Sequence, residues 1–111
     1  MATILPTFLA LGGNALRVTW AGMAGGDTGA PFACNLQRAK TAMIRGTIVG
    51  AVTIEGNNGG GAFLTLTDPQ GTPISYAVAA TEEVLEGVAV IRPAVAAGGG
   101  ASVTVDLIVR P

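Results

Sequence analysis

The side chains that could carry chemistry in this chain are seven carboxylates and one thiol, because the sequence contains no histidine. Without histidine, the usual general base, the commonest metal ligand and every serine–histidine or cysteine–histidine pair are missing. A glycosidase would need two carboxylates facing each other across a cleft. The carboxylates are those of Asp27, Glu55, Asp68, Glu82, Glu83, Glu86 and Asp106. In a small β-domain such residues belong mostly to turns and surfaces, so we predict no catalytic residue and no enzymatic activity.

Asp27 is the acidic residue whose context most resembles an active site. It lies in the sequence Gly-Asp-Thr-Gly at positions 26–29, a pattern that carries the catalytic carboxylate in aspartic proteases. Such an enzyme needs two copies of the motif that share one proton. This chain has one copy, and the flanking residues do not resemble a retroviral protease. We interpret the segment as a turn in which the Asp27 carboxylate accepts hydrogen bonds from local backbone amides.

The sequence offers no pattern typical of a metal or cofactor site. Cys34 is the single cysteine, which excludes an intrachain disulfide and a thiolate zinc cluster, and its apolar neighbours favour a buried thiol. The glycines at positions 59–61 lack the lysine of a phosphate-binding loop, and no EF-hand spacing is present. We expect no cofactor and no metal.

Charge is scarce, at 12% of residues with a net charge of −1, against roughly 25% charged residues in an ordinary soluble domain. The basic residues are scattered, whereas nucleic-acid binding needs a basic face and a positive balance. The apolar first eleven residues lack the basic start of a secretory signal and are too short to cross a bilayer. We expect no binding to nucleic acid or membrane, and interpret the low charge as surface covered by protein partners.

Short alternating segments separated by turn residues about every ten positions must form the scaffold. The clearest are 15–21, 46–55, 62–67, 72–78, 88–95 and 102–110, with weaker strands at 31–36 and 37–45; a helical turn near Arg38 is the alternative for the last. The acidic stretch 81–87 indicates a helical turn or loop with Thr81 as N-cap. We predict an all-β fold, a single antiparallel β-sandwich of seven to eight short strands, with a small β-barrel as the alternative.

The alternation also assigns faces to side chains. Trp20 is the largest single contribution to the core, and Leu64 and Leu66 are expected to point inward together. The same rule places the side chains of Ile74, Tyr76 and Val78 on one face, and those of Val103, Val105, Leu107 and Val109 on the inner face of the last strand. The glycines at 98–100 indicate a hairpin-like link between the last two strands.

Two further motifs are expected to be structural. The sequence Asp68-Pro69-Gln70-Gly71 is typical of a four-residue turn with proline in its favoured second position. Arg92, followed by Pro93, lies in an apolar strand. We interpret its guanidinium as the partner of Glu55, Asp106 or the acidic group at 82–86, and the alternative is an anchor for a neighbouring subunit.

The chain divides into an apolar N-terminal arm, residues 1–14, and a β-sandwich domain, residues 15–111. Pro6 interrupts any helix in the arm. A free apolar arm in water would be a liability, so we expect it to dock on its own domain or on a neighbour.

Several segments occur together in an order that resembles small virion structural proteins of tailed bacteriophages, in particular the capsid decoration or cement class. They are Val18-Thr19-Trp20, Gly26-Asp27-Thr28-Gly29, Ile54-Glu55-Gly56-Asn57-Asn58-Gly59, the stretch from Leu64 to Gly71, and Ile91-Arg92-Pro93 before a glycine-rich turn. The resemblance covers about residues 16–109, and its motifs are structural turns. Related chains often carry aspartate and an aromatic residue after the asparagine turn, where this chain has Gly60, Gly61 and Phe63. The second half also resembles adhesive and discoidin-like sandwiches.

The resemblance implies a protein that binds the outside of an icosahedral head and bridges adjacent major capsid protein subunits. It implies a location on the virion exterior after synthesis in the bacterial host cytoplasm, and a symmetric homo-oligomer such as a trimer. We expect partner contacts at Ile4, Leu5, Phe8 and Leu9 in the arm and at Asp27 and Thr28 in the loop, and structural roles for Trp20, Asp68, Pro69, Gly71, Arg92 and Pro93. The alternatives are a head–tail connector or tail component, and a carbohydrate-binding adhesive module, for which one Trp and one Tyr offer little stacking surface.

Overall fold

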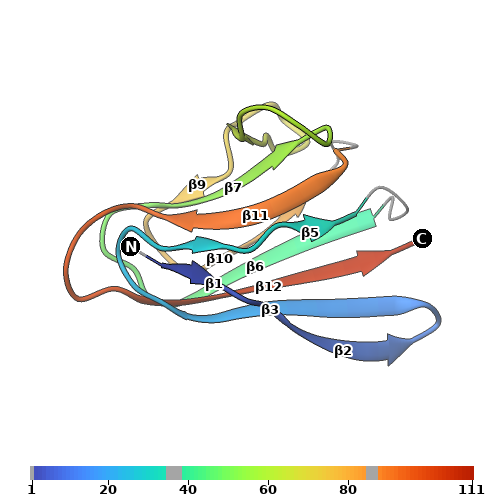
Figure 1. The fold of residues 1–111 in the computed structure, drawn as a ribbon, viewed down its shortest axis with the longest axis horizontal. Coiled ribbons are helices and arrows are strands. Elements are labelled where there is room, and N and C mark those ends of the chain that lie inside the picture. Colours follow the sequence, from blue (N-terminus) through green and yellow to red (C-terminus); the bar gives the residue numbers. More distant parts are fainter. Residues whose placement is uncertain (1, 35–38, 85–87) are drawn as a thin grey trace.

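The computed structural model describes residues 2–34, 39–84 and 88–111, and its two layers of strands are visible in Figure 1. The regular structure of these residues is all β, as predicted. Its strands are β1 (Thr3–Ile4), β2 (Thr7–Gly12), β3 (Ala15–Met23), β4 (Thr28–Gly29), β5 (Phe32–Ala33), β6 (Ala39–Thr47), β7 (Val52–Asn57), β8 (Leu64–Thr65), β9 (Ser75–Tyr76), β10 (Ala80–Val84), β11 (Val90–Val95) and β12 (Ser102–Arg110). The described strands outnumber the predicted seven or eight because several pairings are only two residues long.

Two sheets form the sandwich. One has the order β1-β4-β11-β7-β8, with β5 also paired to β11 and β9 also paired to β7. The other has the order β10-β6-β12-β3-β2. The pairing is antiparallel except between β1 and β4, which run parallel. Consecutive strands often lie in different sheets, so the chain repeatedly crosses from one layer to the other (Figure 1).

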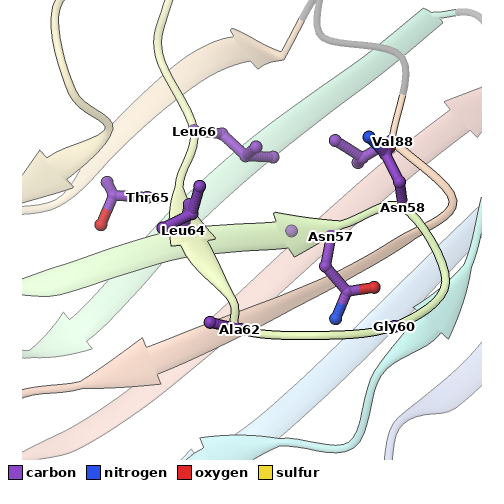
Figure 2. Close-up of a pocket in the computed structure, with 9 residues that line it drawn as sticks. Asn57, Asn58, Gly60, Ala62, Leu64, Thr65, Leu66 and Val88 are labelled. Atoms are coloured by element: carbon purple, nitrogen blue, oxygen red, sulfur yellow. The ribbon is translucent and has the colours of Figure 1, made fainter.

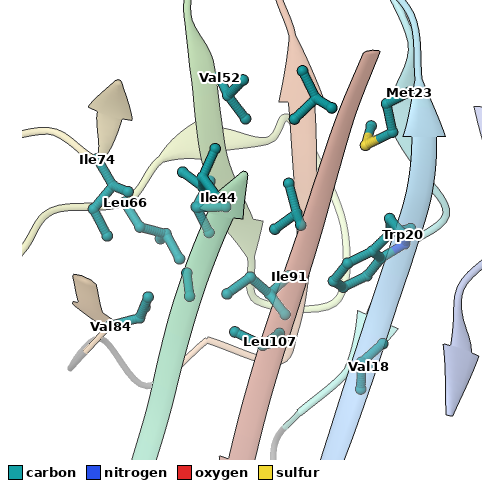
Figure 3. Close-up of a cluster of buried hydrophobic side chains, with 14 of the residues drawn as sticks. Val18, Trp20, Met23, Ile44, Val52, Leu66, Ile74, Val84, Ile91 and Leu107 are labelled. Atoms are coloured by element: carbon teal, nitrogen blue, oxygen red, sulfur yellow. The ribbon is translucent and has the colours of Figure 1, made fainter. Parts of the chain in front are cut away.

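The core lies between the two sheets and is built mainly from β-branched and aliphatic side chains, which suit a pleated surface. Figure 3 shows Val18, Trp20 and Ile91 among the side chains that fill it. The inward residues of β12 are Val103, Val105, Leu107 and Val109, all 1% exposed or less. The predicted core position of Trp20 and the predicted inner face of the last strand are therefore confirmed.

The predicted continuous strand from 46 to 55 is wrong. β6 ends at Thr47 in one sheet, and β7 begins at Val52 in the other. Gly46 and Gly50 have φ values of 109° and 80°, a region that glycine enters without steric cost. The two glycines let the chain leave one layer and enter the other.

The predicted helical turn or loop at 81–87 is also wrong where the structure describes it. Residues 80–84 form β10, whose Glu82 lies opposite Ala42 in an antiparallel ladder with β6. Tertiary pairing overrides the local helix-start pattern around Thr81. Residues 85–87, and the alternative helical turn near Arg38, lie outside the described residues.

Two predicted inward positions fail where a strand is short. Leu66 is buried, but Leu64 is 70% exposed, and Val78 is 69% exposed although Ile74 is buried. β8 and β9 are each only two residues long. The alternation of inward and outward side chains therefore does not continue into the residues beyond them. The glycines at 98–100 do not close a hairpin, because β11 and β12 lie in different sheets.

Candidate functional site

The N-terminal segment supplies an edge strand to both sheets. β1 is the first strand in the order of one sheet, and β2 is the last strand in the order of the other. Leu5 and Pro6 connect the two strands, and Figure 1 shows β1 leading into β2 along the same side of the sandwich. Residues 3–12 are thus paired to the rest of the domain over most of their length.

Asp27 holds the start of this segment in place. Its Oδ2 accepts a hydrogen bond from the Ala24 amide at 2.9 Å, and its Oδ1 accepts one from the Ala2 amide at 2.8 Å. The Ala24 bond, and then the Ala2 bond, lower the pKa of the Asp27 carboxyl below its ordinary value of 3.8. The predicted role of Asp27 in capping local amides is confirmed, and the bond to Ala2 was not predicted.

The backbone around Asp27 continues the attachment of β1. The Thr28 amide donates to the Ala2 carbonyl at 3.0 Å, and the Ala30 amide donates to the Ile4 carbonyl at 2.8 Å. The Ile4 side chain packs against the core cluster. Asp27 and its neighbours therefore hold β1 in place, and β1 directly precedes the exposed residues that follow Ile4.

We expect Asp27→Asn to loosen β1. In aspartate, each of the two carboxylate oxygens accepts a hydrogen bond from a backbone amide. In asparagine, an NH₂ group replaces one of these oxygens, and this group would face an amide that is itself a donor. The folded-state pKa is lowered, so the carboxylate stabilises the fold above pH 3.8, and this contribution disappears as the pH falls through the folded-state value. Wild type and variant should therefore differ in denaturant midpoint at pH 7, and the difference should shrink as the pH is lowered below 3.8.

Hydrogen exchange of the Thr28 and Ala30 amides provides the local readout, since both bond to β1. Asp68→Asn is the matched control, because Asp68 caps a different turn, and its substitution should leave the Thr28 and Ala30 amides protected. Unchanged protection of these amides in Asp27→Asn would contradict the role assigned to Asp27.

Exposed apolar side chains cluster on the N-terminal segment. Leu5 is 77% exposed, Phe8 58%, Leu9 47% and Leu11 45%, and all six residues of β2 are exposed. We call these four residues the N-terminal apolar strip. Such grouping on one segment marks an interaction site more often than scattered apolar residues do.

The register of β2 on β3 assigns the strip to two faces. Leu9 lies opposite Arg17 and Phe8 lies opposite Val18. Because Val18 is buried between the sheets, Phe8 is on the inner face and Leu9 on the outer face. The Phe8 ring lies 6.1 Å from the Phe32 ring, centroid to centroid, a normal spacing for an aromatic pair. Phe8 thus covers the open side of the sandwich while remaining more than half exposed.

The six residues predicted to contact a partner fall into two groups. Leu5, Phe8 and Leu9 are exposed. Ile4 and Thr28 are partly buried, and Asp27 is 7% exposed with both carboxylate oxygens bonded. The contacts of all six residues with a partner stay predictions. Ile4, Asp27 and Thr28 can contribute only by positioning Leu5, Phe8 and Leu9 or through the small areas that they expose.

The other predicted structural residues are well placed. Arg92 lies opposite Glu55, with its Nε 3.0 Å from Oε1 and its guanidinium carbon 3.8 Å from the Phe63 ring centroid. The ion pair named in the sequence interpretation is confirmed, and the stacking on Phe63 adds a cation–π contact. Pro93 lies within β11, opposite Ile54.

The turn at 68–71 is confirmed in detail. Asp68 Oδ1 accepts hydrogen bonds from the Gln70 and Thr72 amides at 2.9 Å, and the Gly71 amide donates to the Asp68 carbonyl at 2.9 Å. Pro69 occupies the second position, and Gly71 has a φ of 84°. An Asx-type turn with these residues is a rigid structural element.

Sequence reasoning missed a polar cluster on the outer face of the five-stranded sheet. Asp106 is 6% exposed, accepts a hydrogen bond from Thr19 Oγ1 at 2.6 Å and pairs with Arg45 Nε at 3.0 Å. Asp106 lies opposite Thr19 on one side and Met43 on the other. Only the strand register brings these residues together, and each looks like an ordinary surface residue in the sequence.

A pocket of about 400 Å³ lies at the end of β7, beside the loop to β8 (Figure 2). Its described lining is Gly56, Asn57, Asn58, Gly60, Ala62, Leu64, Thr65, Leu66 and Val88, and none of these residues is ionisable. Asn57 Oδ1 accepts a hydrogen bond from the Gly59 amide at 2.9 Å, so one polar lining group is already engaged. The described lining therefore offers no ionisable side chain as a general acid or base, and no base that could activate the Thr65 hydroxyl as a nucleophile.

The Cys34 thiol and the Tyr76 hydroxyl, two groups that can take part in catalysis, are both hydrogen-bonded within the domain. Cys34 is buried, which confirms the sequence interpretation, and its Sγ donates to the Val88 carbonyl at 3.3 Å; burial raises the pKa of its thiol. The Tyr76 hydroxyl donates to Glu82 at 2.7 Å, which raises the pKa of Tyr76 to about 12. Among the residues with described positions, no three acidic or cysteine side chains gather in a way that could hold a metal ion.

The described ranges contain no helix long and apolar enough to span a bilayer.

The chain matches no protein-family model and no curated protein. It is similar in structure to the SPBc2 prophage-derived protein YomS, with a TM-score of 0.64 and 16% identity over 91% of this chain and 98% of that one. It is also similar to a cupin domain from Bordetella pertussis Tohama I, with a TM-score of 0.53 and 12% identity over 99% and 96% of the two chains.

A third similar structure is PliG from Aeromonas hydrophila, a periplasmic inhibitor of g-type lysozyme, with a TM-score of 0.50 and 14% identity over 97% and 95% of the chains. At these identities the likeness shows a shared β-sandwich fold and no shared activity. One of the proteins that share the fold is derived from a prophage.

Proposed function

We propose that this protein is a bacteriophage capsid decoration protein that binds the outer surface of the head and bridges major capsid protein subunits. The observation that carries the proposal is the N-terminal apolar strip on a rigid sandwich. Leu5, the most exposed of its members, is 77% exposed at the connection between the edge strands of the two sheets. A protein that stays alone in water gains nothing from such a strip.

Four further observations support this function. The motif order resembles that of decoration proteins, and the fold is shared with a prophage-derived protein. The chain carries few charges, which fits a protein whose surface is covered in an assembly. The ionisable groups discussed above serve the structure through Asp27–Ala2, Arg92–Glu55 and Arg45–Asp106 contacts.

The mechanism is mechanical. Ladders such as β12 between β3 and β6 make the domain stiff, and Asp27 fixes the base of the strip. A stiff body with several contact points can touch more than one capsid subunit, and weak contacts then add through multivalency. The shell would resist internal DNA pressure because separating two subunits would require breaking these additional contacts.

Two other functions from the sequence interpretation compete with this one. A connector or tail component would use the same apolar strip at a ring of defined symmetry. A sugar-binding module would stack exposed aromatic rings on its ligand. Trp20 is 1% exposed, so its ring is not available for stacking, and the Tyr76 ring is partly buried, with its hydroxyl bonded to Glu82.

The test is to add purified protein to phage heads that lack it and to sediment the particles. Decoration predicts saturable binding at many copies per head, with empty heads and DNA-filled heads both competent. Binding confined to tails or to the neck would overturn the proposal in favour of a connector or tail component. Failure to bind any particle, together with binding to a polysaccharide, would favour the adhesive module.

A further inference from the structure

We propose that two copies of this chain pair along β2, antiparallel and across a twofold axis at Leu9. The proposal concerns the isolated protein in solution. It does not depend on binding to a phage shell, so either proposal can fail while the other stands. It differs from the trimer that the sequence resemblance implies.

β2 is an open edge. It is the last strand of the five-stranded sheet and pairs with β3 on one side. On its other side, no strand of the described residues pairs with it, and all six of its residues are exposed. An open edge presents a row of amide and carbonyl groups that match another strand. A second copy of β2 carries the same groups in the order that antiparallel pairing needs.

The distribution of charge favours β2 over the opposite edge of the same sheet. β2 has the sequence Thr-Phe-Leu-Ala-Leu-Gly, with no charged residue and no proline, whereas proteins usually protect an open edge with such residues. The opposite edge strand, β10, contains Glu82 and Glu83. Two copies of β10 would bring like charges together, which destabilises cross-strand pairs.

Pairing of β2 with β10 of another copy is disfavoured for a different reason. That contact is heterologous and leaves one β2 and one β10 free at the two ends, so it extends into a filament unless the rotation closes a ring. Twofold pairing of β2 closes at two copies and leaves the acidic β10 strands as the open edges of the joined five-stranded sheets. The acidic β10 edges then protect the dimer from further growth.

The register follows from the faces of β2. Directly opposed residues must share a face, so pairing centred on Leu9 places Leu9 against its own copy, Phe8 against Ala10, and Thr7 against Leu11. No like charges meet in these pairs, and the nearest charged neighbour is Arg17, on the adjacent strand β3. A twofold axis placed closer to the C-terminal end of β2 would require Gly12 to pair. Gly12 lies beyond the register shift between Ala10 and Gly12, so we favour an axis at Leu9.

Edge pairing uses backbone groups and leaves both faces of β2 accessible. The five-stranded sheets of the two copies would join into one continuous sheet. The N-terminal apolar strips of both copies would then lie side by side. Leu9 would then gain a neighbouring apolar side chain on the outer face, while Leu5 and Phe8 of each copy would remain exposed. A dimer would thus present two copies of the apolar strip to any larger partner.

The first test is the mass of the protein in solution, by light scattering and native mass spectrometry. Wild type should be a dimer. Leu9→Lys, which places two ammonium groups together at the axis, should weaken self-association by roughly tenfold or more. An equimolar mixture of Leu9→Lys and Leu9→Glu should restore the dimer, because residue 9 faces itself only across this axis. Met43→Lys is the matched control, since Met43 is exposed on the outer face of the inner strand β6, and this variant should remain a dimer.

The second test is disulfide formation. Opposed antiparallel residues have Cα atoms about 4.5–5.5 Å apart, within the reach of a disulfide, so Leu9→Cys should cross-link two copies under mild oxidation. Wild type should not, because Cys34 is buried, and Met43→Cys should cross-link poorly.

Three outcomes would overturn the proposal. They are a single-chain mass for wild type at about 100 μM, a trimeric mass, or equal cross-linking of the Leu9→Cys and Met43→Cys variants. Circular dichroism and denaturation of each variant show whether the fold is intact. The cross-link tests the axis directly even if the lysine variant folds poorly.

Discussion

Replacing Trp20 with alanine is expected to lower the free energy of unfolding by about 3–5 kcal/mol, the usual cost of truncating a large buried ring. Trp20 is 1% exposed and lies in the core between the sheets (Figure 3). Its indole Nε1 donates to the Ala30 carbonyl at 3.0 Å, and this carbonyl would lose that donor. Because domains are typically stable by only about 5–15 kcal/mol, this loss would remove a large share of the total stability.

The surroundings of Trp20 leave little room for relaxation. A Cβ placed on Gly29 would lie 2.6 Å from the Trp20 ring and 2.5 Å from Pro93 Cδ, so the ring and Pro93 already fill the space above Gly29. The measurement is urea unfolding followed by circular dichroism. Trp20→Phe should cost less than Trp20→Ala, and Phe8→Ala, at a ring that is 58% exposed, should cost least. A loss below about 1 kcal/mol for Trp20→Ala would contradict this account of the core.

Replacing both Leu5 and Phe8 with aspartate is expected to weaken binding to undecorated heads by about a hundredfold or more. The two side chains are 77% and 58% exposed, so an apolar contact with the shell would be replaced by two carboxylates that must lose water. Loss of about 2.7 kcal/mol per binding unit is a hundredfold in affinity, and multivalent attachment multiplies the effect. The fold should persist, because neither side chain is buried.

Head binding is measured by co-sedimentation over a range of protein concentrations. Val78→Asp is the matched control, because Val78 is an apolar residue that is 69% exposed on the connection between β9 and β10. Normal head binding by the Leu5→Asp/Phe8→Asp variant would exclude the apolar strip as the contact surface. The solution mass of this variant separates lost shell contact from lost pairing along β2.

Substitutions at Leu5 and Phe8 test the contact with the head more specifically than removal of the N-terminal segment does. Removal of residues 1–11 would delete β1 and nearly all of β2. It would also leave β3 as a new open edge and Asp27 without its Ala2 donor. A weaker head binding of such a truncated protein could then reflect a damaged sandwich. Substitution at Leu5 and Phe8 leaves the backbone ladders in place.

The fold could be predicted where alternation is unbroken and a strand is long. Residues 102–110 form one nine-residue strand with the expected inner face. The prediction failed at 46–55 because glycines with positive φ turn the chain between sheets. It failed at 80–84 because pairing with β6 outweighs a local preference of a few tenths of a kcal/mol to about 1 kcal/mol at a helix start.

The candidate site was predictable only in part. Composition shows that the first residues are apolar, and the structure shows that three of the four predicted arm contacts are exposed. Their attachment could not be predicted, because it depends on contacts between distant residues. Asp27 bonds to Ala2, and Phe8 packs on Phe32 across the open side of the sandwich. Likewise, the Asp106 cluster exists only through the register of three neighbouring strands.

The most direct test of the proposed function is the number and position of copies of this protein on purified particles of the phage that encodes it. Cryo-electron microscopy combined with quantitative mass spectrometry gives both values. We predict density on the outer surface of the head, touching more than one major capsid protein subunit, at a copy number that scales with the shell. A single ring of copies at the neck or tail, or particles that lack the protein, would contradict it.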